Sequence, residues 1–327
     1  MPTLDLNDVR FFSGKSHPEL ATEIAAYLSV PLELTHASRF SNDNLYIQLG
    51  ASVRGRVVFI VQSLVPPVSE NLLELLMMLD IARGAGACEV HAIIPYFSYA
   101  RSDKKDAPRI SITARLIADL LQTAGATHIM TMTLHSPQVH GFFSIPTDPL
   151  TARPLFVRHF LEQNLDTTNT IVVAPDMGRA NPAARFAARL GVPVAAAEKR
   201  RISDNEVQIG SQISRQVQGY RRALIYDDEI ATGSTVIQLS RLLVECGIQD
   251  IAIICTHGLF TGNALQRLVE LPQITQIVTT NTVPLRFEKR VSRLVVLSVA
   301  PVFGEAIWRN YTRQSIGDLF SFGEDHP

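Results

Sequence analysis

The sequence predicts an α/β protein of two domains, each with a mostly parallel sheet between helices. The chain has 327 residues, about twice the usual length of one domain. Short β-rich runs alternate with longer helical patterns, which is typical of a parallel sheet. The short runs are continuously apolar, as expected of strands that are buried on both faces.

The pattern of each run places the elements in order along the chain. Strands are expected at Val57–Gln62, Val90–Ile94, His128–Met132, Thr170–Val173, Ala223–Tyr226, Ile251–Cys255, Ile277–Val278 and Leu294–Leu297. Helices are expected between them, at Leu72–Arg83, Ile112–Thr123, Pro182–Leu190, Val236–Cys246 and Gly262–Val269.

A polar connection near the midpoint, Asp148–Asn169, suggests the boundary between the domains. We therefore expect an N-terminal domain over 1–149 and a C-terminal domain over 150–305, with the tail 306–327 packing on the first. A second polar stretch, Arg200–Gln218, lies between two predicted strands. Loops of this length inside a domain are usually functional or mobile.

Composition excludes several classes of protein. Hydrophobic residues make up 46% and charged residues 19% of the chain, so a disordered or collagen-like protein is excluded. Thirty basic and 31 acidic residues leave a net charge of −1, so we expect no binding of nucleic acid or of an anionic membrane.

Segments for targeting, membrane insertion and cross-linking are not expected either. Charged residues begin at Asp5, before an apolar run could form, so no secretory signal is expected. Gln62 interrupts the most apolar run, so no membrane span is expected. With three cysteines and no CxxC spacing, we expect a cytoplasmic protein without disulfides or structural zinc.

The segment 223–235 carries the clearest chemical pattern. An apolar strand is expected to end at Tyr226, followed by Asp227, Asp228, a hydroxyl-rich turn with one glycine, and a helix from Val236. Ligands of open α/β sheets bind at the carboxyl ends of strands, and the amides that begin a helix face an anion. The two carboxylates could accept hydrogen bonds from a sugar diol or approach a divalent cation. The competing interpretation is a capped helix start beside a solvated acidic turn.

The common nucleotide-binding motifs are missing. Gly14-Lys15-Ser16 has no glycine five positions before Gly14, so it is not a Walker A loop. Gly84-Ala85-Gly86 precedes a predicted strand instead of following one, so it is not a dinucleotide fingerprint. Any phosphate must therefore be bound in another way.

With these residues in view, the chain resembles the ribose-phosphate pyrophosphokinases, and segment 227–235 looks like the ribose-phosphate loop of type I phosphoribosyltransferases. The resemblance runs almost end to end and is carried by short segments in the family's order. These are Phe12-Ser13-Gly14, Pro18-Glu19-Leu20, Arg39-Phe40-Ser41, Ser52-Val53-Arg54-Gly55, Val61-Gln62-Ser63, Ile94–Asp106, Leu134-His135, Gly141-Phe142-Phe143, Ala174-Pro175-Asp176, Thr256-His257-Gly258, Glu305-Ala306-Ile307 and Leu319-Phe320.

The resemblance implies two tandem phosphoribosyltransferase-like domains and the transfer of diphosphate from MgATP to ribose 5-phosphate. It implies ATP contacts at Phe40, Asn42, Asn44, Arg101, Ser102 and Asp106, magnesium ligands at His135 and Asp176, and a ribose 5-phosphate site at Asp227, Asp228, Ala231, Thr232, Gly233, Ser234 and Thr235. It also implies a homo-oligomer built from dimers, as in the family's hexamers, which consist of three dimers.

Lys199 and Arg201 resemble the family's catalytic cations on a closing loop. Diphosphoryl transfer depends chiefly on positioning and charge neutralisation, so cations in this role are physically reasonable. Each assignment has a simpler competitor. The charge run could be a solvated face, Phe40 could belong to the core, and His135 could be a satisfied histidine at a strand end. Arg101 could make ordinary surface ion pairs, and Asp176 could cap a helix.

The chain departs from the family at chemically important positions. The usual residues are Asp, Asp, Gly, Gln and Glu, where this chain has Thr133, Ala231, Arg179, Ser102 and Asn44. Thr133 would weaken the positioning of His135. Arg179 adds a cation to the expected diphosphate loop, and its Cβ would be strained if that position required a positive φ. Together these changes could retune magnesium use or nucleotide choice, or abolish activity.

The sequence therefore leaves more than one hypothesis open for both regulation and function. Ser52, Arg54 and Arg109 match positions of a regulatory phosphate or ADP site, whereas the usual C-terminal Ser-Val-Ser reads Ser315-Ile316-Gly317. The leading hypothesis is an active ribose-phosphate pyrophosphokinase. The second is a non-catalytic paralogue that regulates an active partner. The third, a phosphoribosyltransferase that consumes the product, is disfavoured by the ATP-side residues and by the double-domain length.

Overall fold

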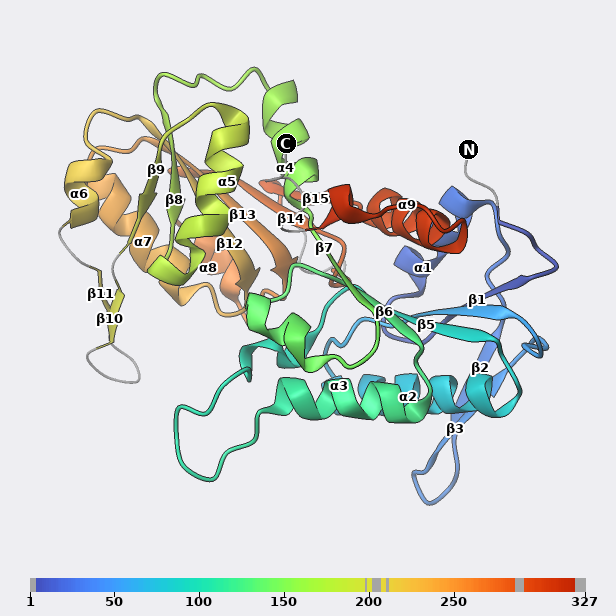
Figure 1. Cartoon of the computed structure of the whole chain (residues 1–327). Helices are drawn as coiled ribbons and strands as arrows, with labels where there is room; N and C mark the ends of the chain where they lie inside the picture. The colour runs from blue at the N-terminus through green and yellow to red at the C-terminus, as the bar shows by residue number, and fades with distance from the viewer. Residues whose placement is uncertain (1–3, 198, 202–206, 210–211, 286–290, 321–327) are drawn as a thin grey trace. The chain divides into compact units, whose positions relative to one another are not determined.

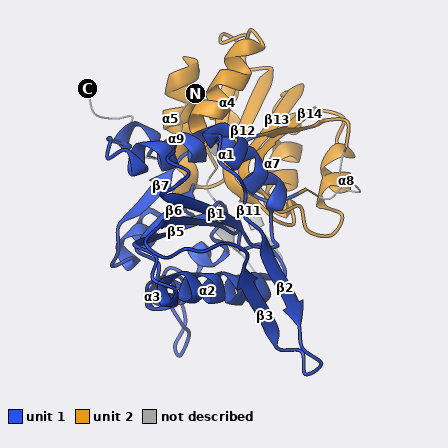
Figure 2. Ribbon diagram, turned by 90° about the vertical axis from the view of Figure 1, so that its right-hand side faces the viewer, with its two compact units in different colours: residues 1–151, 282–284, 298–327 blue, residues 152–281, 285–297 orange. Residues whose placement is uncertain are grey.

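A computed structural model describes residues 4–197, 199–201, 207–209, 212–285 and 291–320 of the chain (Figure 1). The chain forms two compact units (Figure 2). The first unit comprises 1–151, 282–284 and 298–327, and the second comprises 152–281 and 285–297. No helix in the described part of the chain is long and apolar enough to cross a membrane.

The first unit is built on a parallel sheet of five strands. Their spatial order is β1 (Val9–Ser13), β4 (Val57–Val61), β5 (Glu89–Ile94), β6 (His128–Met132) and β7 (Thr147–Leu150). Strand β4 is apolar along its whole length, and β5 is buried from Val90 to Ile94, as expected of central strands in a parallel sheet that is covered on both faces. An antiparallel hairpin of β2 (Thr35–Arg39) and β3 (Leu45–Leu49) extends from this unit.

Two pairs of helices belong to this unit. Helices α2 (Val68–Gly84) and α3 (Thr113–Ala124) pack together, as do α1 (Pro18–Leu28) and α9 (Ala300–Tyr311) (Figure 1). Gly304 on α9 lies against the ring of Tyr27 on α1, where an added Cβ would overlap the ring. A residue with a side chain would therefore push the two helices apart.

The second unit contains a parallel sheet of six strands. Their order is β15 (Leu294–Leu297), β14 (Ile274–Thr280), β13 (Asp250–Gly258), β12 (Arg222–Ile230), β8 (Thr170–Ala174) and β9 (Val194–Ala196). Its helices are α4 (Arg153–Glu162), α5 (Ala180–Leu190), α6 (Gln212–Gln216), α7 (Ser234–Glu245) and α8 (Ala264–Val269). Strands β10 (Lys199–Arg201) and β11 (Val207–Ile209) form a separate antiparallel hairpin.

The predicted α/β class is confirmed, and each predicted strand and helix overlaps one in the structure. The stretch Asp148–Asn169, interpreted as a polar connection, also contains α4, a helix that was not predicted. Pro154 in the first turn provides a favourable start for this helix, and Phe156 and Phe160, four residues apart, are both fully buried. The predicted loop at Arg200–Gln218 likewise contains β11 and α6, and its other residues lie partly outside the described ones.

Candidate active site

Two adjacent carboxylates lie near the carboxyl end of β12. The strand continues to Ile230 instead of ending at Tyr226, so Asp227 and Asp228 lie within it, and Asp227 is in register with Cys255 of β13. Asp228 is 5% exposed, and its backbone N–H donates to Asp227 Oδ1 over 2.9 Å. Burial, followed by the charge of Asp228, raises the pKa of Asp227 well above its ordinary value of 3.8. The pair is therefore poised to gain from a cation or from hydroxyl donors.

A tight loop carries the chain from this acid pair into α7. Gly233 has φ +72°, a left-handed conformation that favours glycine, and its carbonyl accepts the first helical hydrogen bond from the N–H of Ile237 at 2.9 Å. Gly233 provides no side-chain cap for α7, and the Thr232 and Ser234 hydroxyls lie 3.3 Å apart. The first N–H groups of a helix have no intrahelical partner, so this end is suited to an anion.

A second loop follows the neighbouring strand β8. Asp176 accepts a hydrogen bond from the backbone N–H of Arg179 at 3.1 Å and so caps the short 3₁₀ turn Met177–Arg179. Arg179 has φ −95°, so the expected strain at this position is absent. Its guanidinium Nη1 lies 3.3 Å from Asp228 Oδ2, and the two side chains are 11% and 5% exposed.

Thr133, which precedes His135 by two residues, ends β6 with an unusual backbone. Its φ is +44°, which is rare for a β-branched residue, and its N–H donates to the Leu150 carbonyl at 2.9 Å. Such strain persists only where the surrounding structure enforces it, and it is commonly found at functional sites. The side chain of His135, which follows this turn, is half-buried.

The candidate nucleotide residues of the β2–β3 hairpin lie at its tip. Phe40 is 58% exposed and contacts Tyr46 edge-to-face, with centroids 5.5 Å apart, so it does not belong to the core. The Phe40 N–H donates to the Asn44 carbonyl at 2.9 Å, and the Asn42 side chain accepts from the Asn44 N–H at 3.3 Å. An exposed aromatic ring beside two amides is a suitable surface for a planar base.

The remaining candidate nucleotide residues lie near the 3₁₀ turn Ser98–Arg101. Arg101 and Asp106 are exposed. The Ser102 hydroxyl donates to the Ser111 carbonyl and accepts from the Thr113 N–H, both at 3.3 Å, so it closes the segment between them.

The predicted regulatory residues are all on the surface. Ser52, Arg54 and Arg109 are exposed, and Arg109 has a left-handed φ of +63°. The candidate catalytic residues Lys199 and Arg201 belong to β10, but their side chains lie outside the described residues.

With this geometry established, comparisons decide the family. Residues 9–125 match the N-terminal domain of ribose phosphate pyrophosphokinase, and residues 211–321 match the phosphoribosyl synthetase-associated domain. A provisionally named ribose-phosphate pyrophosphokinase of Streptomyces coelicolor is 51% identical over 96% of this chain and 98% of its own. The chain belongs to the ribose-phosphate pyrophosphokinase family.

Further relatives agree with this assignment. The ribose-phosphate pyrophosphokinase of Deinococcus radiodurans is 43% identical over 95% of this chain and 97% of its own. The crystal structure of phosphoribosylpyrophosphate synthetase from Mycobacterium smegmatis matches with a TM-score of 0.87 and 36% identity, over 94% of this chain and 99% of that one. The family predicted from the sequence is therefore confirmed, as is the fold of two tandem phosphoribosyltransferase-like domains.

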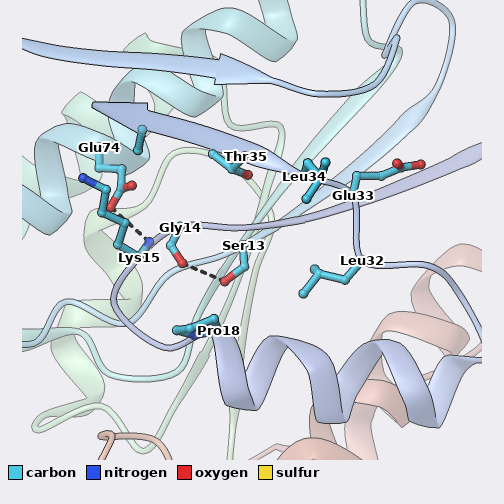
Figure 3. A pocket seen from close by; sticks show the side chains of 10 residues that line it. Ser13, Gly14, Lys15, Pro18, Leu32, Glu33, Leu34, Thr35 and Glu74 are labelled. Atoms are coloured by element: carbon cyan, nitrogen blue, oxygen red, sulfur yellow. Dashed lines mark hydrogen bonds between the residues drawn. The ribbon is translucent and has the colours of Figure 1, made fainter. Parts of the chain in front are cut away.

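A pocket in the first unit does not coincide with the candidate site. It has a volume of about 380 Å³ and lies beside the Gly14-Lys15-Ser16 turn (Figure 3). The fully buried Gln62 donates to Glu74 Oε2 at 2.7 Å and accepts from the Ser16 N–H at 3.1 Å, while the backbone N–H of Lys15 donates to the same Glu74 oxygen at 3.2 Å. The turn is thus fixed by a buried polar network, as expected of a structural segment.

One described carboxylate is of a kind that suits magnesium arriving with a nucleotide. Mg²⁺ is usually bound by one or two carboxylates together with substrate phosphates, and Asp176 presents such a carboxylate at the end of β8. Among the described residues, no three or more His, Cys, Asp and Glu side chains form a cluster able to hold an ion.

One contact of this site was not predicted from the sequence. Arg179 was expected only as an added charge, and its pairing with Asp228 was missed. The pairing could have been predicted only from the order of the strands in the sheet, because β8 and β12 are neighbours although about 50 residues separate them in the chain.

Proposed function

We propose that this protein transfers the β,γ-diphosphoryl group of ATP to ribose 5-phosphate, giving 5-phosphoribosyl 1-diphosphate and AMP. The O1 hydroxyl of the sugar attacks the β-phosphorus of ATP. The bond between that phosphorus and the oxygen that bridges it to the α-phosphorus breaks, so AMP leaves with this oxygen, and the hydroxyl proton passes to solvent. The observation that carries the proposal is the acid pair on β12 followed by the uncapped start of α7, within a chain of this family.

The ribose 5-phosphate site follows from this arrangement. The carboxylates of Asp227 and Asp228 accept hydrogen bonds from the 2- and 3-hydroxyls of the sugar. The loop takes the 5-phosphate through its backbone N–H groups and hydroxyls, which belong to Ala231, Thr232, Gly233, Ser234 and Thr235.

The ATP site is assigned to five exposed residues of the first unit and to the half-buried Ser102. The ring of Phe40 stacks on the base, Arg101 offsets phosphate charge, and Asn42, Asn44, Ser102 and Asp106 supply polar contacts. Lys199 and Arg201 stabilise the charge that develops on the transferring group. His135 and Asp176 would hold magnesium, and the ion would supply charge neutralisation on the phosphate oxygens.

Three further proposals concern organisation. The two compact units correspond to the N-terminal domain with its C-terminal tail and to the C-terminal domain. The protein forms a homo-oligomer built from dimers, up to a hexamer, which light scattering after size exclusion would measure. Ser52, Arg54 and Arg109 form a regulatory site for phosphate or ADP, which a titration of activity with each anion would test.

The deciding experiment is ³¹P NMR of the protein with ribose 5-phosphate, ATP and Mg²⁺. Equal amounts of AMP and 5-phosphoribosyl 1-diphosphate are expected. If both ligands bind but no product forms with Mg²⁺ or Mn²⁺, the protein is the non-catalytic paralogue. Release of pyrophosphate from 5-phosphoribosyl 1-diphosphate on addition of a free nucleobase would instead indicate a phosphoribosyltransferase.

A further inference from the structure

The loop after β8 presents a basic side chain to the ribose acid pair. Arg179 is the last residue of the turn that Asp176 caps and directly precedes α5. Its guanidinium Nη1 reaches Asp228 Oδ2 on the neighbouring strand at 3.3 Å. With side-chain exposures of 11% and 5%, this ion pair is shielded from water far more than a surface pair.

The surrounding contacts fix both partners of this pair. Strands β8 and β12 are joined in parallel register, with Val173 opposite Ile225. Phe186 on α5 stacks on Tyr226, which directly precedes the acid pair, with ring centroids 4.6 Å apart. The loop that holds Arg179 is therefore fixed relative to the strand that holds Asp228, and the two side chains of the ion pair are held close together within the second unit.

Charge explains what the pair does for a substrate. Two adjacent carboxylates repel each other, and they also repel a phosphorylated sugar that approaches them. Arg179 offsets one of these charges: its positive charge lowers the pKa of Asp227, opposing the upward effects of burial and of Asp228. The ion pair also fixes one Asp228 oxygen, which limits the directions in which that carboxylate can receive the sugar hydroxyls.

We propose that Arg179 is a positioning residue for ribose 5-phosphate: it holds and partly neutralises Asp228, so that the acid pair accepts the sugar diol without rejecting the phosphorylated substrate. This inference rests on the proposed function, whose ribose site it deepens. Because Arg179 acts through Asp228, its effect on binding should depend on that carboxylate.

A double-mutant cycle tests this dependence. Calorimetric titration with ribose 5-phosphate alone would compare wild type with Arg179→Gln, Asp228→Asn and the double variant. In the wild-type background, Arg179→Gln is expected to weaken binding by roughly tenfold or more. In the Asp228→Asn background, the same substitution should cause no clear further loss of affinity. Arg179→Lys, which keeps the charge, should recover part of the affinity. Arg189→Gln, at an exposed position of α5, is the matched control and should bind as wild type.

Turnover separates a positioning role from a structural one. Arg179→Gln should raise KM for ribose 5-phosphate while kcat at saturation stays within about threefold of wild type. Wild-type affinity in Arg179→Gln, or equal losses with and without the Asp228 carboxylate, would overturn the inference and leave the proposed function intact. A wild-type protein that neither binds ribose 5-phosphate nor forms product would overturn the proposed function, and the inference with it.

Discussion

Phe186 and Tyr226 stack with their ring centroids 4.6 Å apart and their planes 17° from parallel. Phe186 belongs to α5, and Tyr226 is the residue before the acid pair on β12. Phe156 and Phe160 of α4 complete this aromatic cluster through edge-to-face contacts with Tyr226 and Phe186 respectively. The cluster thus connects the core of the second unit to the positions of its chemically important side chains.

Removal of the Phe186 ring should destabilise the protein. Phe186 is fully buried, so Phe186→Ala is expected to lower the free energy of unfolding by about 3–5 kcal/mol, through lost burial and the cavity left behind. Urea denaturation followed by circular dichroism would measure this. Leu161→Ala, at a residue of α4 that is 52% exposed, should change the free energy by less than about 0.5 kcal/mol. Equal effects of the two variants would contradict the packing described.

Stability should fall in acid, because of a cluster of ionisable side chains around Glu89 in the first unit. His91 and the guanidinium of Arg313 donate to Glu89, at 3.0 and 2.8 Å, and lower the pKa of Glu89 from 4.5 to about 2. Since the folded state favours the carboxylate, this contribution is complete above pH 4.5 and is lost as the pH falls toward 2. Burial lowers the pKa of His91 below 6.5, so its contribution is complete above that pH and is also lost in acid.

Denaturation at pH 7, 5 and 3 would check this direction. Glu89 is one third exposed, so solvent screening reduces its share of the loss between pH 5 and pH 3 to about 1 kcal/mol. Glu89→Gln should remove that share and leave the rest of the acid destabilisation unchanged. A variant whose stability falls between pH 5 and 3 as steeply as wild type would show that Glu89 does not contribute.

The cations of β10 should affect catalysis more than stability. Lys199→Ala or Arg201→Ala is expected to lower kcat by two or more orders of magnitude, because transition-state charge would lose a stabilising partner. The melting temperature should change by only a few degrees. Arg200→Ala is the matched control, since it removes the same charge from the same strand, and its kcat should be close to wild type. Unchanged rates for both Lys199 and Arg201 variants would exclude the catalytic role.

The hydroxyl of Thr232 should contribute to substrate binding. Thr232→Val preserves the shape of the loop but removes a donor to the 5-phosphate, so KM for ribose 5-phosphate should rise by roughly five- to tenfold while kcat changes little. Steady-state kinetics with ribose 5-phosphate as the varied substrate would measure both constants. Thr312→Val, at an exposed threonine after α9, should leave them unchanged. A fall in kcat at constant KM would instead assign Thr232 to the chemical step.

The sequence predicts some elements closely and misses others. The strand Leu294–Leu297 agrees at both ends because its residues are all apolar and polar residues, Arg293 and Ser298, stand on either side of it. The helix Ala300–Tyr311 was missed. It buries apolar and small residues against α1, and the sequence alone does not show that these residues pack on a helix from the other end of the chain. The first helix, Pro18–Leu28, was missed although Pro18 and the N-cap His17 mark its start.

The candidate site shows the same division. Asp227, Asp228 and the following loop are contiguous in the sequence, so local pattern alone brings them together. The pairing of Asp228 with Arg179 depends on which strands become neighbours, and local pattern does not contain that information. The exposure of Phe40 also depends on the tertiary structure, since an aromatic residue in an isolated sequence is more readily assigned to a core.

The position of α9 against α1 has a consequence for biosynthesis. The ribosome releases the N-terminal strands and helices of the first unit long before residues 298–320, which complete it. The second unit, whose segments are nearly contiguous, emerges in the interval. Until α9 has been synthesised, the face of α1 that receives Gly304 stays uncovered, and nascent chains with such exposed apolar faces are the ones that chaperones engage. Shortening the chain before α9 would therefore leave the N-terminal unit incomplete, although every residue removed is at the opposite end of the chain.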